Sequence, residues 1–532
     1  MTQQNKYGKV LSTSNSPTHT IVDFQVEDWE HCNIGKFVTI PKTIGEEFIA
    51  VITSPHVHTE EYSDPALVKF YTQRGRDPAH VLPNIGSYLY LSARIIGLWD
   101  GENLKFDGSV PKPGTDVLQI SENKLKQIFR LDAGEIFLGH LFFYPDIEVR
   151  LRTQIFMREH SAVFGVTRSG KSYTSGVILE ELIKINSPVL IIDPHGEYHS
   201  LGQPNDVPAE VEKLNSIGLD PRLFNIQEFS PPSFVDTEQG EREITVNFSD
   251  LTAAEIIELT GFSGENQQAL IFETARTLQG IDYTINHFLN IAERNNGQLS
   301  LNVNMGVIRA RVEILQRRGI FGNGFVPSEL INTNQVSIIN LSGLDKNTQQ
   351  ITVAALLRRI FRARTYGDIP YFSLFIEEAH RFAPSSSDPI SKSTVEEIAK
   401  EGGKFGISLH IVSQRPSEVS NTLLSQCETK IFHKLIEVPD VNYARSVLGV
   451  ASPELAESVP NLSVGSAIIM GGITNYQPIY TLIRPRQSRH GGGTAQVRLR
   501  RRRGGGERPP PAEPEEDIDV TRENRQPSLF DF

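Results

Sequence analysis

Gly165-Val166-Thr167-Arg168-Ser169-Gly170-Lys171-Ser172 is the stretch of sequence that decides the fold. It matches the pattern Gly-x-x-x-x-Gly-Lys-Ser in full. The apolar segment Ser161–Phe164 precedes it and predicts a strand, and the segment Tyr173–Ile185 that follows predicts a helix. A strand, a glycine-rich loop and a helix in this order are the context that the pattern requires, so the sequence predicts a P-loop that binds nucleotide phosphates.

The chemistry of this loop follows from its residue types. Glycines let the backbone curl so that successive N–H groups point at phosphate oxygens, beside a helix N-terminus that favours anions. We expect residues 165–173, Tyr173 included, to hold the phosphates. Lys171 supplies a positive charge at the β- and γ-phosphates, and the Ser172 hydroxyl is a ligand of Mg²⁺. The alternative is a glycine-rich turn with a purely structural role.

Two carboxylates end another apolar segment, Phe375-Ile376-Glu377-Glu378-Ala379-His380. An acid at a strand end orients the hydration shell of Mg²⁺, and a neighbouring acid polarises the attacking water. We assign Glu377 to the first role and Glu378 to the second. Most such sites use Asp first, so the longer Glu377 indicates contact through water. The alternative is a pair of solvated acids at a helix start.

A third strand-end element is Ser413-Gln414-Arg415-Pro416. A glutamine at a strand end beside the nucleotide can contact the γ-phosphate and report its loss, and we assign Gln414 to this role. The alternative is a simple turn ahead of Pro416.

The chain divides into three regions. Residues 1–145 contain short alternating runs separated by turn residues, which predict a small N-terminal β-barrel. In residues 146–486, apolar segments alternate with helical stretches, which predicts a parallel α/β sheet with a helical insertion at about 250–330. Residues 487–532 are rich in Gly, Arg and Pro and predict a disordered tail. The expected strands of the sheet are Ser161–Phe164, Val189–Ile192, Val336–Leu341, Phe372–Ile376, Ile407–Val412 and Lys430–His433.

Composition limits the possible partners. No uninterrupted apolar run reaches the roughly 18 residues of a membrane span. The two cysteines, Cys32 and Cys427, fit a reducing compartment, so we expect a cytoplasmic protein without a membrane. A formal net charge of −12 argues against a surface coated in basic residues. It does not exclude nucleic acid, because a local basic channel binds phosphates whatever the total charge is.

These motifs resemble the HerA family of hexameric DNA-translocating ATPases, within the HerA/FtsK group of P-loop NTPases. The resemblance implies a RecA-like core behind a β-barrel, and a homohexameric ring with ATP and Mg²⁺ between subunits. It also implies double-stranded DNA through the ring, and a partner nuclease in DNA end processing or an effector enzyme in antiviral defence. Besides the P-loop, the runs that carry it are Asp193-Pro194-His195-Gly196-Glu197-Tyr198, Phe375-Ile376-Glu377-Glu378-Ala379-His380-Arg381, Lys404-Phe405-Gly406 and Ser413-Gln414-Arg415-Pro416-Ser417-Glu418-Val419, with Leu424-Ser425-Gln426-Cys427 beyond.

Two positions depart from the family pattern. The family commonly has arginines at the positions of Glu159 and Gly403, the first acting across the subunit boundary. The charge that stabilises the transferring phosphoryl group must then come from elsewhere, and Arg158, Lys404 and Arg415 are candidates for a trans-acting or sensor role. Two functions therefore stay open: a motor that hydrolyses ATP and pumps DNA, or an ATP-binding hexameric scaffold with weak hydrolysis that activates a partner effector.

The end of the chain, Gln526-Pro527-Ser528-Leu529-Phe530-Asp531-Phe532, has the character of a docking peptide. Gln526, Leu529, Phe530 and Phe532 resemble the Gln-x-x-Leu-Phe motif that binds bacterial sliding clamps. A clamp, another partner and no partner are the alternatives. The arginine-rich part of the tail is either an arm for nucleic acid or a segment that contacts its own acidic half.

Overall fold

The computed structural model describes residues 6–13, 16–26, 33–58, 69–70, 72–74, 88–131, 134–333, 335–449 and 451–491. The predicted docking residues Gln526, Leu529, Phe530 and Phe532 lie outside the described residues. In these described ranges, no helix is long and apolar enough to cross a membrane.

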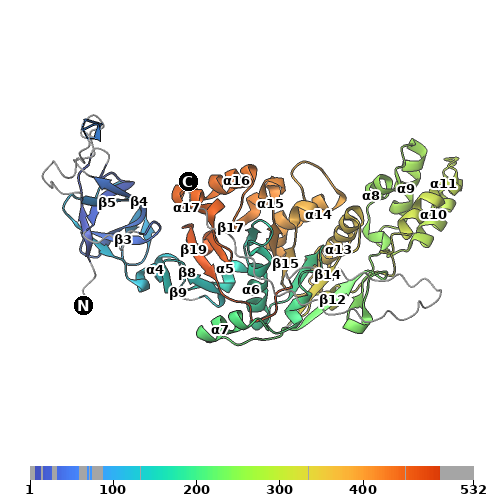
Figure 1. Cartoon of the computed structure of the whole chain (residues 1–532). Helices are drawn as coiled ribbons and strands as arrows, with labels where there is room; N and C mark the ends of the chain where they lie inside the picture. Colours follow the sequence, from blue (N-terminus) through green and yellow to red (C-terminus); the bar gives the residue numbers. More distant parts are fainter. Residues whose placement is uncertain are drawn as a thin grey trace. The chain divides into compact units, whose positions relative to one another are not determined.

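A closed β-barrel forms the N-terminal part of the described chain (Figure 1). Its strands are β1 (Lys6–Val10), β2 (Ile21–Val26), β3 (Phe37–Thr43), β4 (Glu46–His58), β5 (Tyr88–Trp99), β6 (Leu104–Lys105) and β7 (Asp116–Gln119). They pair antiparallel in the order β2-β1-β7-β3-β4-β5-β6, and a further pairing of β2 with β5 closes the barrel. Val22, Phe24 and Leu91 are buried inside it. The predicted N-terminal barrel is confirmed.

The second sheet has twelve strands in the order β13-β12-β14-β11-β15-β16-β10-β17-β18-β19-β8-β9. Neighbours are parallel from β13 to β17 and antiparallel from β17 to β9. The bounds are β8 (Ile136–Leu141), β9 (Tyr144–Leu151), β10 (His160–Phe164), β11 (Val189–Asp193), β12 (Ile226–Ser230), β13 (Arg242–Glu243), β14 (Val336–Asn340), β15 (Phe372–Ile376), β16 (Ile407–Ser413), β17 (Cys427–Phe432), β18 (Ser466–Met470) and β19 (Ile479–Ile483).

The six predicted strands correspond to β10, β11, β14, β15, β16 and β17, so the parallel α/β core is confirmed. One strand, β16, lies between β10, which precedes the P-loop, and β15, which precedes the two acids; this is the RecA-like arrangement. Both faces of the sheet are covered, as a parallel sheet requires. Ala162 and Phe164 of β10 enter the hydrophobic cluster that contains Leu356 of α13 (Lys346–Tyr366), whereas Val163 enters the one that contains Val177 of α6 (Lys171–Lys184).

A helical insertion follows β13 (Figure 1). It consists of α8 (Ala253–Thr260), α9 (Glu265–Thr277), α10 (Ile285–Gln298) and α11 (Met305–Gln316), which confirms the predicted insertion. Thr252 caps α8, and Glu255 returns a hydrogen bond to its backbone, so the insertion starts with a capping box. Leu270, Phe288 and Ile308 are fully buried and join the cluster of the main core.

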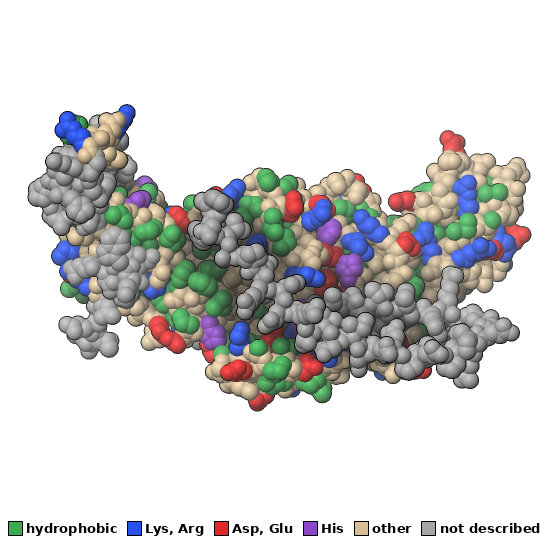
Figure 2. Space-filling model, viewed as in Figure 1, with side chains coloured by type: hydrophobic (Ala, Val, Ile, Leu, Met, Phe, Trp, Pro, Cys, Tyr) green, Lys and Arg blue, Asp and Glu red, His purple; other side chains and the backbone are tan. Residues whose placement is uncertain are grey.

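The remaining helices connect and cover the strands. They are α4 (Glu122–Ile128), α5 (Thr153–Phe156), α7 (Pro208–Ser216), α12 (Pro327–Leu330), α14 (Ile390–Glu401), α15 (Asn421–Gln426), α16 (Val438–Leu448) and α17 (Pro453–Ser458). Short 3-10 turns are η2 (His199–Gly202), η3 (Thr237–Gln239), η4 (Phe248–Asp250), η5 (Ala379–Arg381), η6 (Gly402–Phe405), η7 (Pro416–Glu418), η8 (Val459–Asn461) and η9 (Gly472–Thr474). On the face that Figure 2 shows, basic and acidic side chains are interspersed.

Residues 484–491, which we call the C-terminal strap, lie against α6. Arg484 is fully buried, with its guanidinium 3.0 Å from Glu180 Oε2 and 2.8 Å from Glu181 Oε1. The backbone N–H groups of Gln487 and Ser488 donate to the carboxylate of Glu180 at 3.1 and 2.9 Å. The sheet also takes in β8 from residue 136. We therefore propose that the core extends from about residue 136 to about residue 491.

Replacing Arg484 with Met would remove the fully buried guanidinium that Glu180 and Glu181 share, and would leave only Arg486, 3.6 Å from Glu180, and Lys184, 2.5 Å from Glu181. We expect Arg484→Met to lower the free energy of unfolding by about 3–5 kcal/mol, measured by urea denaturation. The matched control is Arg276→Met, which removes an exposed pair with Glu273 (2.6 Å) and should cost about 1 kcal/mol or less. Equal effects of the two substitutions would contradict a structural role of the strap.

Candidate functional site: a phosphate-binding loop facing two buried carboxylates

Close packing and backbone geometry both require glycine in the loop between β10 and α6. A Cβ at Gly165 would lie 2.3 Å from Ser169 Oγ and 2.7 Å from His433 Cβ, so no side chain fits there. Gly170, just before α6, has φ 112°, a left-handed conformation that glycine adopts without strain. The loop backbone is therefore fixed by what surrounds it.

The loop presents backbone N–H groups that are free to bind an anion. Within the part of the chain that the structure describes, no acceptor is found for the N–H groups of Thr167, Arg168, Gly170, Lys171 and Ser172. The first N–H groups of a helix have no partner inside it and carry partial positive charge. A curled loop that leads into a helix N-terminus in this way suits a phosphate group.

His433 forms the floor of the loop, directly after β17. Its Nδ1 lies 2.8 Å from Ser466 O, so this nitrogen donates, and Nε2 accepts from Thr174 Oγ1 of α6 at 2.9 Å. Burial, assisted by the charge of Lys171, lowers the pKa of His433 to about 4. The ring is therefore neutral at pH 7 and fixes the loop by hydrogen bonding and packing.

The structure brings Lys171, Ser172, Glu377 and Glu378 together. Lys171 Nζ donates to Glu377 Oε1 and lies 3.4 Å from Glu378 Oε1, and Ser172 Oγ donates to Glu377 Oε1 at 3.3 Å. Lys171, Glu377 and Glu378 are all buried, with exposed fractions of 5%, 1% and 3%. Glu378 also has φ 52°, a strained value for a non-glycine residue of the kind that occurs at functional sites.

The two carboxylates differ in proton affinity. Burial raises the pKa of Glu377, and the charge of Lys171 opposes this rise. Burial acts in the same direction on Glu378, but its hydrogen bond with His380, the charge of Lys171 and the amide of Gln414 outweigh it and hold the pKa at about 2. Burial disfavours the charge of Lys171, yet Glu377 and Glu378 raise its pKa overall. Glu378 is therefore ionised at every ordinary pH.

Gln414 connects the loop to the second acid. It follows β16, the strand between β10 and β15, and its Oε1 accepts from Thr167 Oγ1 at 2.7 Å. Its Nε2 donates to Glu378 Oε1 at 2.5 Å. The other predicted loop residues, Val166 and Arg168, lie in the same curl, where Val166 N donates to Lys434 O at 3.0 Å.

The structure does not bring Arg158, Lys404 or Arg415 to this cluster. All three side chains are exposed. Lys404 pairs with Glu401 at 2.6 Å, and Arg415 pairs with Glu418 at 2.5 Å. Within their own chain they therefore contribute no charge to the loop.

Glu159 and Gly403, the two departures from the family pattern, lie together at the start of β10. Glu159 is half-buried and accepts from Thr429 Oγ1 at 3.2 Å, and burial raises its pKa. A Cβ at Gly403 would lie 3.9 Å from Arg158 O.

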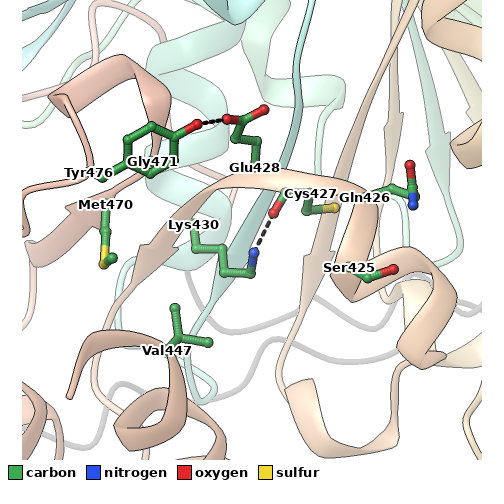
Figure 3. A pocket seen from close by; sticks show the side chains of 9 residues that line it. All are labelled: Ser425, Gln426, Cys427, Glu428, Lys430, Val447, Met470, Gly471 and Tyr476. Carbon is green, nitrogen blue, oxygen red and sulfur yellow. Dashed lines mark hydrogen bonds between the residues drawn. The ribbon is translucent and has the colours of Figure 1, made fainter. Parts of the chain in front are cut away.

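A pocket of about 400 Å³ lies near the N-terminal end of β17 (Figure 3). Glu428, Lys430, Met470 and Tyr476 are among the residues that line it, the tyrosine hydroxyl donates to Glu428, and Lys430 donates to Cys427 O. Because β10 and β17 are parallel, the P-loop at the C-terminal end of β10 is at the opposite edge of the sheet. The pocket is therefore separate from the phosphate site.

Sequence reasoning missed two side chains that the structure joins to this site. One is His433, which appeared only as the last residue of a strand. The other is Tyr198, whose hydroxyl donates to Glu377 Oε2 at 2.8 Å. The run that ends in Tyr198 carries the resemblance to the HerA family, but its residue types alone predict no role for the tyrosine. A polar residue directly after an apolar strand was the available signal for His433.

Asp193, the last residue of β11, organises this run. It is fully buried, and its carboxylate accepts from the backbone N–H groups of His195, Gly196 and Tyr198 at 3.1, 2.8 and 3.1 Å. Burial, with the charges of Glu377 and Glu197, raises the pKa of Asp193 to about 7 against the effect of these hydrogen bonds.

A phosphate-binding loop at the carboxyl edge of a parallel sheet, with strand-end acids in contact with its lysine, defines the class of P-loop NTP hydrolases. Residues 136–360 match the family model described as the central domain of helicase HerA. Over these residues the chain is similar to the HerA family, and it is an ATP-hydrolysing enzyme.

Alignments with known proteins of similar sequence extend over most of the chain. A probable helicase of Methanocaldococcus jannaschii is 28% identical over 426 residues, which are 76% of this chain and 79% of that protein. The DNA double-strand break repair helicase HerA of Sulfolobus acidocaldarius is 27% identical over 468 residues, 82% of this chain and 86% of that protein. Among solved structures, VirB4 of Thermoanaerobacter pseudethanolicus aligns with a TM-score of 0.45 at 14% identity, over 66% of this chain and 96% of that one.

The packing at Gly165 predicts that even a methyl group disturbs the loop. We expect Gly165→Ala to weaken binding of a fluorescent ATP analogue at least about tenfold, or about 1.4 kcal/mol, because Ser169 or His433 must move. Gly297→Ala in α10 is the control, because a Cβ there meets nothing within 4 Å. Unchanged affinity in Gly165→Ala would show that the loop accommodates a side chain.

The raised pKa of Asp193 predicts a pH-dependent stability. The folded pKa of about 7 lies above the unfolded value of about 4, so folding retains a proton that the unfolded chain releases. The resulting stability is fully present below about pH 4 and is lost as the pH rises through 7. The free energy of unfolding of the wild type, relative to Asp193→Asn, should therefore fall between about pH 4 and 7 and stay constant above. Denaturant titrations of both proteins measure this difference, which a pH-independent result would contradict.

Proposed function

We propose that the chain is an ATP-dependent DNA motor of the HerA type, in which Lys171, Ser172, Glu377, Glu378 and Gln414 carry the chemistry. The observation that supports this most is the buried contact of Lys171 with both carboxylates, which puts the loop and the acids in one site. The site lies at the carboxyl edge of a parallel sheet, which is the usual position of a nucleotide site in such folds.

ATP with Mg²⁺ fits the residues that are present. The unpaired N–H groups of the loop suit phosphate oxygens. The Ser172 hydroxyl and the Glu377 carboxylate, 3.3 Å apart, are oxygen donors of the kind that Mg²⁺ prefers, directly or through water. Mg²⁺, when bound, supplies positive charge to the phosphate oxygens. The loop residues 165–173 hold the phosphates, and Ser172 and Glu377 orient the metal.

Lys171 links nucleotide binding to the acids. On binding, its ammonium turns from the carboxylates to the β- and γ-phosphates, and its effect on the pKa of Glu378 weakens. The carboxylate of Glu378 then becomes a better acceptor for the proton of an attacking water, because a base is most effective when its pKa approaches the ambient pH. Gln414, bonded to both Thr167 and Glu378, senses whether a γ-phosphate is present.

DNA and a ring complete the proposal. Relatives in other organisms are named as DNA double-strand break repair helicases, which supports double-stranded DNA as the substrate. We propose a homohexamer with ATP between subunits, in which Arg158, Lys404 or Arg415 reaches a neighbour's phosphates, since all three are exposed in their own chain. A nuclease or effector enzyme, in DNA end processing or antiviral defence, and a sliding clamp at Gln526, Leu529, Phe530 and Phe532 are the proposed partners.

A hexameric scaffold that binds ATP and activates an effector is the second candidate. Glu159 and Gly403, at the positions where the family commonly has arginines, favour it, because weak stabilisation of the transferring phosphoryl group slows hydrolysis. The two candidates share the phosphate site and differ in turnover.

Hydrolysis by the named residues is directly testable. We expect Lys171→Ala to abolish ATP binding, and Glu378→Gln to bind ATP while its turnover falls about 100-fold or more. Lys213→Ala, an exposed lysine of α7, should match the wild type. Phosphate release with and without duplex DNA measures the rates. Release that persists in Lys171→Ala would end the motor proposal, and ATP binding without DNA-stimulated turnover would favour the scaffold.

A further inference from the structure

The run Asp193–Tyr198 has no role in the scheme above, yet it ends at the site. Tyr198 is 2% exposed, and its hydroxyl donates to Glu377 Oε2 at 2.8 Å. The other oxygen of the same carboxylate, Oε1, accepts from Lys171 and Ser172. We propose that Tyr198 is a positioning residue that holds Glu377 with one oxygen facing the metal site, a proposal that rests on the proposed function.

Strand order explains why this run reaches Glu377. β11, which ends at Asp193, is the parallel neighbour of β15, and Glu377 N donates to Ile192 O at 3.1 Å. The segments that follow β11 and β15 therefore leave the sheet side by side. A side chain a few residues beyond β11 can reach the first residue beyond β15 without crossing another strand.

Asp193 then directs Tyr198 to its target. By accepting three backbone N–H groups, its buried carboxylate curls the following residues into a tight loop, in which Gly196 has φ 75°. The Tyr198 ring is packed in the hydrophobic cluster of α6 with Leu201 and Phe224. The backbone and the ring of Tyr198 are thus both fixed, and its hydroxyl is directed at Glu377.

The outer end of the same loop is fixed as well. Gln349 of α13 donates to Pro194 O at 3.2 Å, and Arg381 donates to Gln349 Oε1 at 2.6 Å. Arg381 lies three residues after Glu378, so the loop is attached to the acidic segment at both ends. This places Tyr198 and Glu377 on one connected unit.

The Glu377 side chain is long and flexible, and the Tyr198 hydroxyl restrains it. The terminal torsion of a glutamate side chain is broad, so its carboxylate turns freely unless hydrogen bonds hold it. The buried Oε2 has Tyr198 as its hydrogen-bond donor in the described part of the chain. Loss of that bond leaves a buried acceptor unpaired and lets the carboxylate rotate away from Ser172. Groups that orient metal ligands in this way commonly change metal affinity or activity by 10- to 100-fold.

The test is Tyr198→Phe in the full chain, which keeps the ring and removes the hydroxyl. We measure the Mg²⁺ concentration for half-maximal binding of a fluorescent ADP analogue and, separately, for half-maximal ATP hydrolysis. Both should rise about tenfold or more. The KM for ATP at saturating Mg²⁺ should stay within about twofold of the wild type. A tyrosine that serves only the core would not alter the Mg²⁺ dependence.

Tyr144→Phe is the matched control. Tyr144 of β9 is half-buried, and its hydroxyl accepts from the backbone N–H of Phe37 at 3.0 Å, away from the site. We expect this variant to alter the unfolding midpoint and leave the Mg²⁺ dependence unchanged. An unchanged Mg²⁺ dependence in Tyr198→Phe, in a protein whose nucleotide binding requires Lys171, would overturn the role of Tyr198 alone. Nucleotide binding that does not require Lys171 would overturn the proposed function and this inference together.

Discussion

One buried positive charge held between two negative charges is the constraint on which the rest of the structure depends. Lys171 begins α6, whereas Glu377 and Glu378 follow β15, and these elements meet because only β16 separates β10 from β15. Removing such charges from water is costly unless each one is paired and hydrogen-bonded. Three features therefore act together to pair these buried charges: the curl of the loop, the order of the strands and the left-handed backbone of Glu378.

The same constraint allows Lys171 to exchange one negative partner for another. In the proposed function, a phosphate group brings several negative oxygens to the place where the carboxylates meet Lys171, so nucleotide and acids compete for one cation. The contacts of Gln414 with Thr167 and of Tyr198 with Glu377 do not depend on that cation. They keep the acids in position while the lysine changes partner, which is what a site that cycles between occupied states requires.

Much of the fold follows from local pattern. The β-branched segments, the glycine-rich loop and the helical insertion each carry a periodicity or a composition that identifies the element. The site is harder to predict from sequence, because no single strand indicates the order of the strands in a parallel sheet. The meeting of Tyr198 and Glu377 follows from the pairing of β11 with β15, and nothing near either residue in the sequence indicates it.

The ends of the core are difficult to place from sequence for a related reason. β8 lies before residue 145, within the range expected for the barrel, but it pairs with β19 in the core sheet. Arg486, Gln487 and Ser488 have the composition of a tail, yet they are buried, because Glu180 inside the protein supplies the matching charge and acceptors. Composition reports polarity, and burial depends on whether a partner exists elsewhere in the chain.

The pairing of β8 with β19 has a consequence for synthesis of the protein on the ribosome. Leu141 is paired with Thr481, so one strand of the sheet waits for a partner made 340 residues later. Contacts between residues so distant in sequence form slowly and leave strand edges exposed meanwhile. During translation, the edges of β8 and β10 that pair with β19, β16 and β17 therefore stay open until those strands are made, and an open strand edge can pair with another chain.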